Sequence, residues 1–68
     1  MHTAYSTALF HVQAALPKHL RSTARAMVAA MEGGTDELQA LAATRFGPND
    51  AAHRAKVHSI LKRHGIAL

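Results

Sequence analysis

The architecture is set by helix stops and starts in residues 33–65, which read GGTDELQALAATRFGPNDAAHRAKVHSILKRHG. The Gly-Gly pair that opens this stretch and the Gly-Pro pair at residues 47–48 are typical helix terminators. Glycine takes the left-handed conformation that ends a helix, and proline cannot continue one. The pattern predicts one helix over residues 36–46 and another over residues 50–64, which ends at the last glycine.

Each of these two helices begins after a residue that suits an N-cap. Thr35 is the expected N-cap of the first, and either Asn49 or Asp50 is the expected N-cap of the second. The apolar spacing of the first helix predicts that its buried face consists of Leu38, Leu41, Ala42 and Phe46.

Two further helices are predicted upstream, over residues 4–15 and 17–32. Thr3 is a suitable N-cap for the first, and Pro17 fits the first turn of the second, where its missing N–H costs nothing. The sequence therefore predicts a single all-α, four-helix domain spanning residues 1–68. A short turn containing Gly47 joins the last two helices, which makes that pair similar to a helix-turn-helix unit.

The composition limits how this domain can be stabilised. The chain has 68 residues and no cysteine, so disulfides and thiolate metal sites are excluded. Alanine supplies the largest share of its apolar residues and buries little area. A thin core in so short a chain favours a homodimer. No apolar run is long enough for a membrane span and no signal peptide is recognisable, so a cytoplasmic location is expected.

The last helical segment is cationic and has no acid from Ala51 onward. Its basic residues form two rims around a strip of small side chains, Ala52, Ala55 and Ser59. Small residues between cationic rims let a helix approach a polyanion closely, as recognition helices do in the DNA major groove. The predicted nucleic-acid-binding residues are Arg54, Lys56, His58, Ser59, Lys62 and Arg63.

The competing interpretation of these cations is an ordinary solvated face whose last turn complements the helix dipole. Solvated helices usually mix charges to gain i,i+4 pairs, however, and this segment does not. A secondary basic stripe, Lys18, Arg21 and Arg25, lies on the second helix. It either extends the same surface or forms another one.

The six histidines do not have the spacing of a helical metal site. Two imidazoles meet on one helix face when they are three or four residues apart, and no pair here has that spacing. The serines lack a base and an orienting group nearby, and no phosphate-binding glycine loop is present. We therefore expect no metal, no cofactor, no small-molecule substrate and no enzymatic activity.

The alternative function is protein binding. An apolar stripe on the first helix has the spacing of a helix-pair seam, and Phe10 lies off this stripe as a candidate anchor. The predicted protein-interface residues are Tyr5, Leu9, Phe10, Val12 and Leu16. The leading hypothesis is a small basic regulatory module that binds DNA, for example in transcription regulation. The alternative is an adaptor or inhibitor that binds another protein.

Overall fold

The computed structural model describes residues 4–66, in which all regular secondary structure is helical and no strand is present. The all-α, four-helix prediction is confirmed. The elements, in chain order, are α1 (Ala4–Ala15), a 3-10 turn η1 (Lys18–Leu20), α2 (Arg21–Glu32), α3 (Glu37–Ala43) and α4 (Asp50–Arg63).

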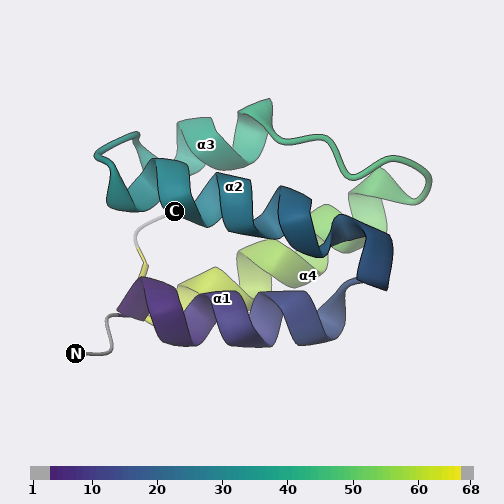
Figure 1. The fold of residues 1–68 in the computed structure, drawn as a ribbon, viewed down its shortest axis with the longest axis horizontal. Helices are drawn as coiled ribbons and strands as arrows, with labels where there is room; N and C mark the ends of the chain where they lie inside the picture. The colour runs from purple at the N-terminus through teal and green to yellow at the C-terminus, as the bar shows by residue number, and fades with distance from the viewer. Residues whose placement is uncertain (1–3, 67–68) are drawn as a thin grey trace.

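The helices run back and forth along the long axis of the molecule (Figure 1). α1 packs against both α2 and α4, and α3 packs along the other side of α2. In Figure 1, α1 and α2 lie nearest the viewer, and α4 lies behind them. The core therefore lies between the α1–α2 pair in front and α4 behind.

Several element boundaries differ from the prediction. The second helix starts with the 3-10 turn, in which the Leu20 N–H donates to the Pro17 carbonyl over 2.9 Å, and the α-helix proper begins only at Arg21. The connection between α3 and α4 spans residues 44–49, whereas a helix-turn-helix unit uses about three or four residues. The helix-turn-helix-like resemblance is therefore left without support.

α3 ends at Ala43, three residues earlier than predicted. Thr44 is extended, with φ −83° and ψ 138°, and its hydroxyl donates to the Ala40 carbonyl over 2.7 Å. The Leu41 carbonyl, which would accept from residue 45 in a longer helix, accepts from Thr44 N–H and from Arg54 instead. These contacts replace the bonds that would continue α3.

The glycine stops after α2 and α4 behave as the sequence predicts, whereas α3 ends before Gly47 is reached. After α2, Gly34 has φ 106°, Thr35 N–H donates to the Ala30 carbonyl and Gly34 N–H to the Met31 carbonyl. This bond pair is the Schellman motif. α4 ends in the same way at Gly65, and Ile66 then packs into the core.

One predicted N-cap is wrong, and another occupies the predicted position without a capping bond. The α3 cap is Asp36, whose carboxylate accepts from Gln39 N–H over 3.1 Å, rather than Thr35. Asn49 occupies the N-cap position of α4 in the left-handed region, with φ 63°, and its side chain makes no capping bond. Asp50 instead turns its carboxylate back to Phe46 N–H, at 2.9 Å. The proposed Thr3 cap lies outside the described residues.

The buried face predicted for the third helix is partly wrong. Leu41 and Phe46 are buried, but Leu38 is 56% exposed and Ala42 is exposed. Phe46 reaches the core from the connection after α3, where it is fully buried. α3 is too short to bury a wide stripe, so its inner face is reduced to Ala40 and Leu41.

Alanine allows the helices of the core to approach closely. Ala8 on α1 and Ala24 on α2 are completely buried. We expect Ala24→Leu to destabilise the fold by about 1–3 kcal/mol, because a larger side chain overpacks the core. Ala29→Leu places the same side chain at an exposed position of the same helix and should change stability by less than about 0.5 kcal/mol. Urea denaturation of both variants checks this, and equal effects would contradict the packing described.

Candidate functional site

The exposed side of α4 is a cationic surface. Val57, Ile60 and Leu61 turn inward and are buried. The opposite side is exposed, and we call it the α4 cationic face, comprising Lys56, Lys62, Arg63, Ala52, Ala55 and Ser59. His58 is half-buried at its edge. From Ala51 to Ile66 no acid interrupts this surface.

Arg54, predicted as a DNA contact, is engaged inside the protein. Its Nε donates to the Asp50 carboxylate over 3.2 Å, and Nη2 reaches the other Asp50 oxygen at 3.3 Å. Nη1 donates to the Leu41 carbonyl and Nη2 also to the Thr44 carbonyl. The guanidinium lies 5.4 Å from the centre of the Phe46 ring. Because all three nitrogens are used, Arg54 has a structural role, and its part in binding nucleic acid stays a prediction.

These contacts form a clamp that closes the connection between α3 and α4. We call Phe46, Asp50 and Arg54 the loop clamp. Asp50 holds Phe46 N–H, Arg54 holds Asp50, and the same guanidinium satisfies two carbonyls that α3 leaves without helical partners. Hydrogen bonds to charged groups are stronger than neutral ones. The clamp therefore fixes where α4 starts and, with it, the orientation of the α4 cationic face.

The pKa of Asp50 lies below its usual value of 3.8, mainly because Arg54 donates to the carboxylate and also because Phe46 N–H does. A lowered folded-state pKa contributes stability at higher pH that is lost as the pH falls through the folded pKa. We expect the free energy of unfolding to fall below about pH 4. Asp50→Asn should flatten this decline in the free energy of unfolding, whereas Glu32→Gln, at an exposed control position, should not. Denaturation series at several pH values measure it. An unchanged pH profile in Asp50→Asn would contradict the clamp.

A second contact joins distant parts of the chain at the other end of the molecule. The Tyr5 hydroxyl of α1 donates to the Glu37 carboxylate at the start of α3. This bond lowers the pKa of Glu37 and raises that of Tyr5. The Tyr5 hydroxyl thus has a partner within its own chain. The spacing of the α1 stripe does not predict this contact.

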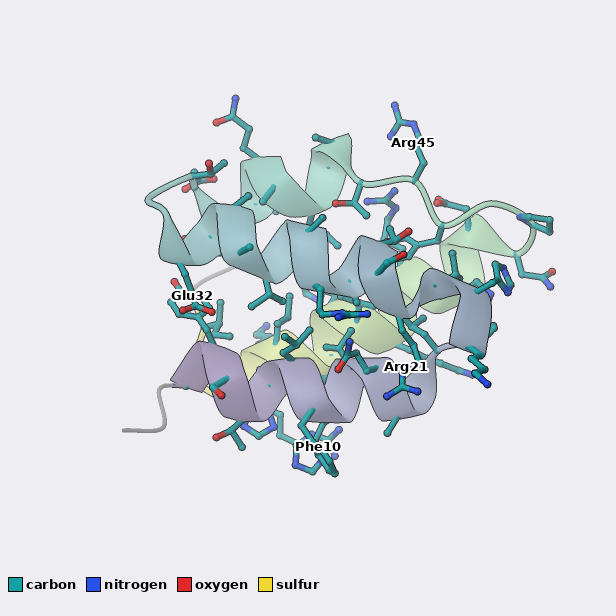
Figure 2. All side chains as sticks on the ribbon, viewed as in Figure 1. Phe10, Arg21, Glu32 and Arg45 are labelled. Atoms are coloured by element: carbon teal, nitrogen blue, oxygen red, sulfur yellow. The ribbon has the colours of Figure 1, made fainter. Side chains whose placement is uncertain are left out.

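The protein-interface stripe predicted on α1 lies mostly in or against the core of this chain. Val12 is fully buried and Leu16 is 7% exposed, both in the core of this single chain, and Tyr5 and Leu9 pack partly against that core. The stripe therefore faces α2 and α4, and its spacing reflects intramolecular packing. Phe10 is the exception, because it is 69% exposed and points away from the core (Figure 2).

Sequence spacing missed one histidine pair, because its members belong to different helices. His11 on α1 stacks on His64 at the end of α4, with ring centres 5.1 Å apart, and Phe10 meets the edge of His11 at 5.5 Å. His53 is half-buried, and its Nδ1 has no hydrogen-bond partner. Among residues 4–66, no group of three or more metal-binding side chains gathers in one place.

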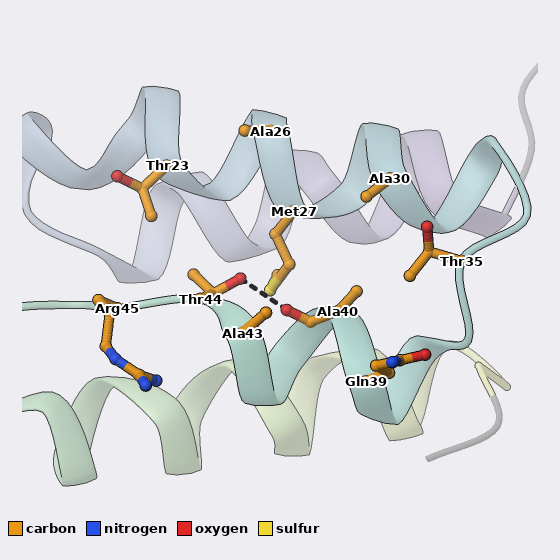
Figure 3. Close-up of a pocket in the computed structure, with 10 residues that line it drawn as sticks. All are labelled: Thr23, Ala26, Met27, Ala30, Thr35, Gln39, Ala40, Ala43, Thr44 and Arg45. Carbon is orange, nitrogen blue, oxygen red and sulfur yellow. Dashed lines mark hydrogen bonds between the residues drawn. The ribbon is translucent and has the colours of Figure 1, made fainter.

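Two mostly apolar grooves border α3. The groove between α2 and α3, about 720 Å³, is lined mainly by alanine and threonine, with Met27 at its base (Figure 3). The groove between α3 and α4, about 540 Å³, is lined by Leu38, Leu41, Ala42, Ala51, Arg54, Ala55 and His58. The exposed Leu38 forms part of the wall of this second groove.

Comparison of the chain with protein-family models, with curated proteins and with solved structures gave no match. In the part of the chain that the structure describes, no helix has the length and apolar character needed to cross a membrane.

Proposed function

We propose that this protein is a non-enzymatic, cytoplasmic regulatory module that binds duplex DNA through the α4 cationic face. The observation that carries the proposal is the exposure of Lys56, Lys62 and Arg63 around a floor of small residues, with no acid on that surface. Such a surface attracts polyanions and presents little bulk to obstruct a close approach.

The three cations have different places along α4. Lys62 and Arg63 lie in its last turn and Lys56 lies near its middle, so they contact phosphates on either side of a groove in this proposal. Ser59 lies between them and supplies a hydroxyl donor to a phosphate oxygen. Arg54 contributes indirectly, because the loop clamp positions the start of α4.

Lys62→Ala/Arg63→Ala should weaken DNA binding to all sequences, because both side chains contact phosphates in this proposal. The slope of log affinity against log salt should flatten by about 1.8, from about 0.9 for each lost phosphate contact. Fluorescence anisotropy with a short labelled duplex measures both quantities. Arg45→Ala is the matched control, since Arg45 is exposed but belongs to the connection after α3. Equal loss in Arg45→Ala would show that net charge alone is being measured.

A second candidate function is protein binding, including binding of a second copy of the chain. The specific observation in its favour is Phe10, a large aromatic side chain that is 69% exposed on α1. Exposed aromatic residues are frequent anchors of protein interfaces. In this candidate, Phe10 is the centre of the interface, while Val12 and Leu16 support it from the core.

A further inference from the structure

The cations of the secondary basic stripe gather at a groove of their own. A hollow of about 530 Å³ lies beside η1, between the end of α1 and the start of α2. We call it the α2 basic groove. It is lined by Gln13, Lys18, His19, Arg21, Ser22 and Arg25, and none of these residues is acidic.

The cations of this groove are available to a ligand. Lys18, Arg21 and Arg25 are all exposed. Within residues 4–66, Arg54 and Asp50 form the one ion pair, so none of these three cations is neutralised by a carboxylate. The Gln13 side chain donates to the Arg21 carbonyl over 3.2 Å, which ties α1 to the start of α2 and holds the two walls of the groove together.

The α2 basic groove and the α4 cationic face lie on opposite sides of the molecule. Arg21 is on the side nearest the viewer, in front of α1 and α2, whereas α4 lies behind them (Figure 2). The exposed side of α4 is opposite the buried Val57 and Leu61, so it faces away from the α2 basic groove. The hydrophobic core separates the two surfaces.

Their separation makes the two surfaces electrostatically independent. The shorter dimensions of the molecule are 21 and 19 Å. The Debye length at physiological ionic strength is about 8 Å, so a charge on one side is largely screened from the other. The α2 cations therefore add little to the affinity of a duplex bound at α4.

We propose that the α2 basic groove binds a second DNA duplex, so that one copy of the protein bridges two duplexes. This inference rests on the proposed function of α4. The groove favours nucleic acid because its lining is polar: three cations are accompanied by His19, Ser22 and Gln13, which suit phosphate oxygens. An acidic protein segment is the competing occupant, and the test includes it.

The experiment is a capture assay with the full chain. A duplex fixed on beads is incubated with protein and with a second, fluorescent duplex, and the captured fluorescence is measured. Wild-type protein should capture the second duplex, with a maximum at intermediate protein concentration, because excess protein coats each duplex separately. Arg21→Ala/Arg25→Ala should lower capture about tenfold while changing the affinity for a single duplex by less than about twofold.

Three controls separate the outcomes. Arg45→Ala should capture like wild type, and circular dichroism should show the same helicity in all variants. Phe10→Ala should also capture like wild type. If a dimer bridged the two duplexes instead, capture would depend on Phe10 and would survive loss of the α2 cations. A fluorescent polyglutamate probe replaces the second duplex in a parallel assay.

The failure of this inference differs from failure of the proposed function. Binding of one duplex without capture of a second, or capture that survives Arg21→Ala/Arg25→Ala, overturns bridging alone. Capture of polyglutamate but not of the second duplex overturns it in favour of an acidic protein partner. Absence of any duplex binding overturns both proposals.

Discussion

Replacing Phe46 with alanine is expected to leave this domain barely stable. Phe46 is fully buried and is the largest such side chain in the described part of the chain. Phe→Ala substitutions in a core cost about 3–5 kcal/mol, and a chain of 68 residues has only about 3–10 kcal/mol of total stability. Thermal denaturation followed by circular dichroism should show a transition that is shifted far downward or lost.

A graded series makes this result interpretable. Phe46→Leu keeps most of the apolar volume and should lose far less stability than Phe46→Ala. Phe10→Ala removes the same side chain from an exposed position and should change stability by less than about 0.5 kcal/mol. A fully cooperative, wild-type-like transition in Phe46→Ala would contradict the burial of this ring and the closed connection between α3 and α4.

Arg54→Ala should have the next largest effect, a loss of about 2–3 kcal/mol in the free energy of unfolding. The substitution removes four hydrogen bonds and leaves the Leu41 and Thr44 carbonyls and the Asp50 carboxylate without this partner. In a domain of this size, such a loss corresponds to a fall of about 10–20 °C in Tm. Urea denaturation and thermal melts measure it.

Comparing the stability of Arg54 variants with that of Lys56→Ala distinguishes a structural role of Arg54 from the effect of losing a surface charge. Lys56→Ala removes an exposed cation from the same helix and should change stability by less than about 0.5 kcal/mol. Arg54→Lys keeps the charge but loses the planar fork, so it should fall between wild type and Arg54→Ala. If Arg54→Ala were as stable as Lys56→Ala, the loop clamp would be wrong.

The helices and their stops could be predicted because they depend on local chemistry. Gly34 and Gly65 both take positive φ and close Schellman motifs, which the sequence signals through glycine after an apolar helix. The end of α3 could not be predicted, because it depends on Arg54, a residue ten or more positions later. Leu38 fits the helical pattern but lies on a seven-residue helix that cannot bury it.

The candidate site was predicted only in part, for a similar reason. The exposure of Lys56, Lys62 and Arg63 follows from helix periodicity, which places them opposite Val57 and Leu61. Arg54 is also a cation of this helix, but it lies at the edge of α4 that faces α3. There it donates to backbone carbonyls and to Asp50. An arginine four residues after an aspartate on a helix is the one local signal of this pairing.

The most direct test of the central proposal is the salt dependence of binding to a short DNA duplex. With three phosphates neutralised by Lys56, Lys62 and Arg63, log affinity should fall against log salt with a slope of about −2.7. In the Arg21→Ala/Arg25→Ala background, which removes duplex binding at the α2 basic groove, replacing all three cations by alanine should bring that slope close to zero without unfolding the protein. Binding that is undetectable even at about 50 mM salt, or a slope unchanged by the triple replacement, would contradict DNA recognition by the α4 cationic face.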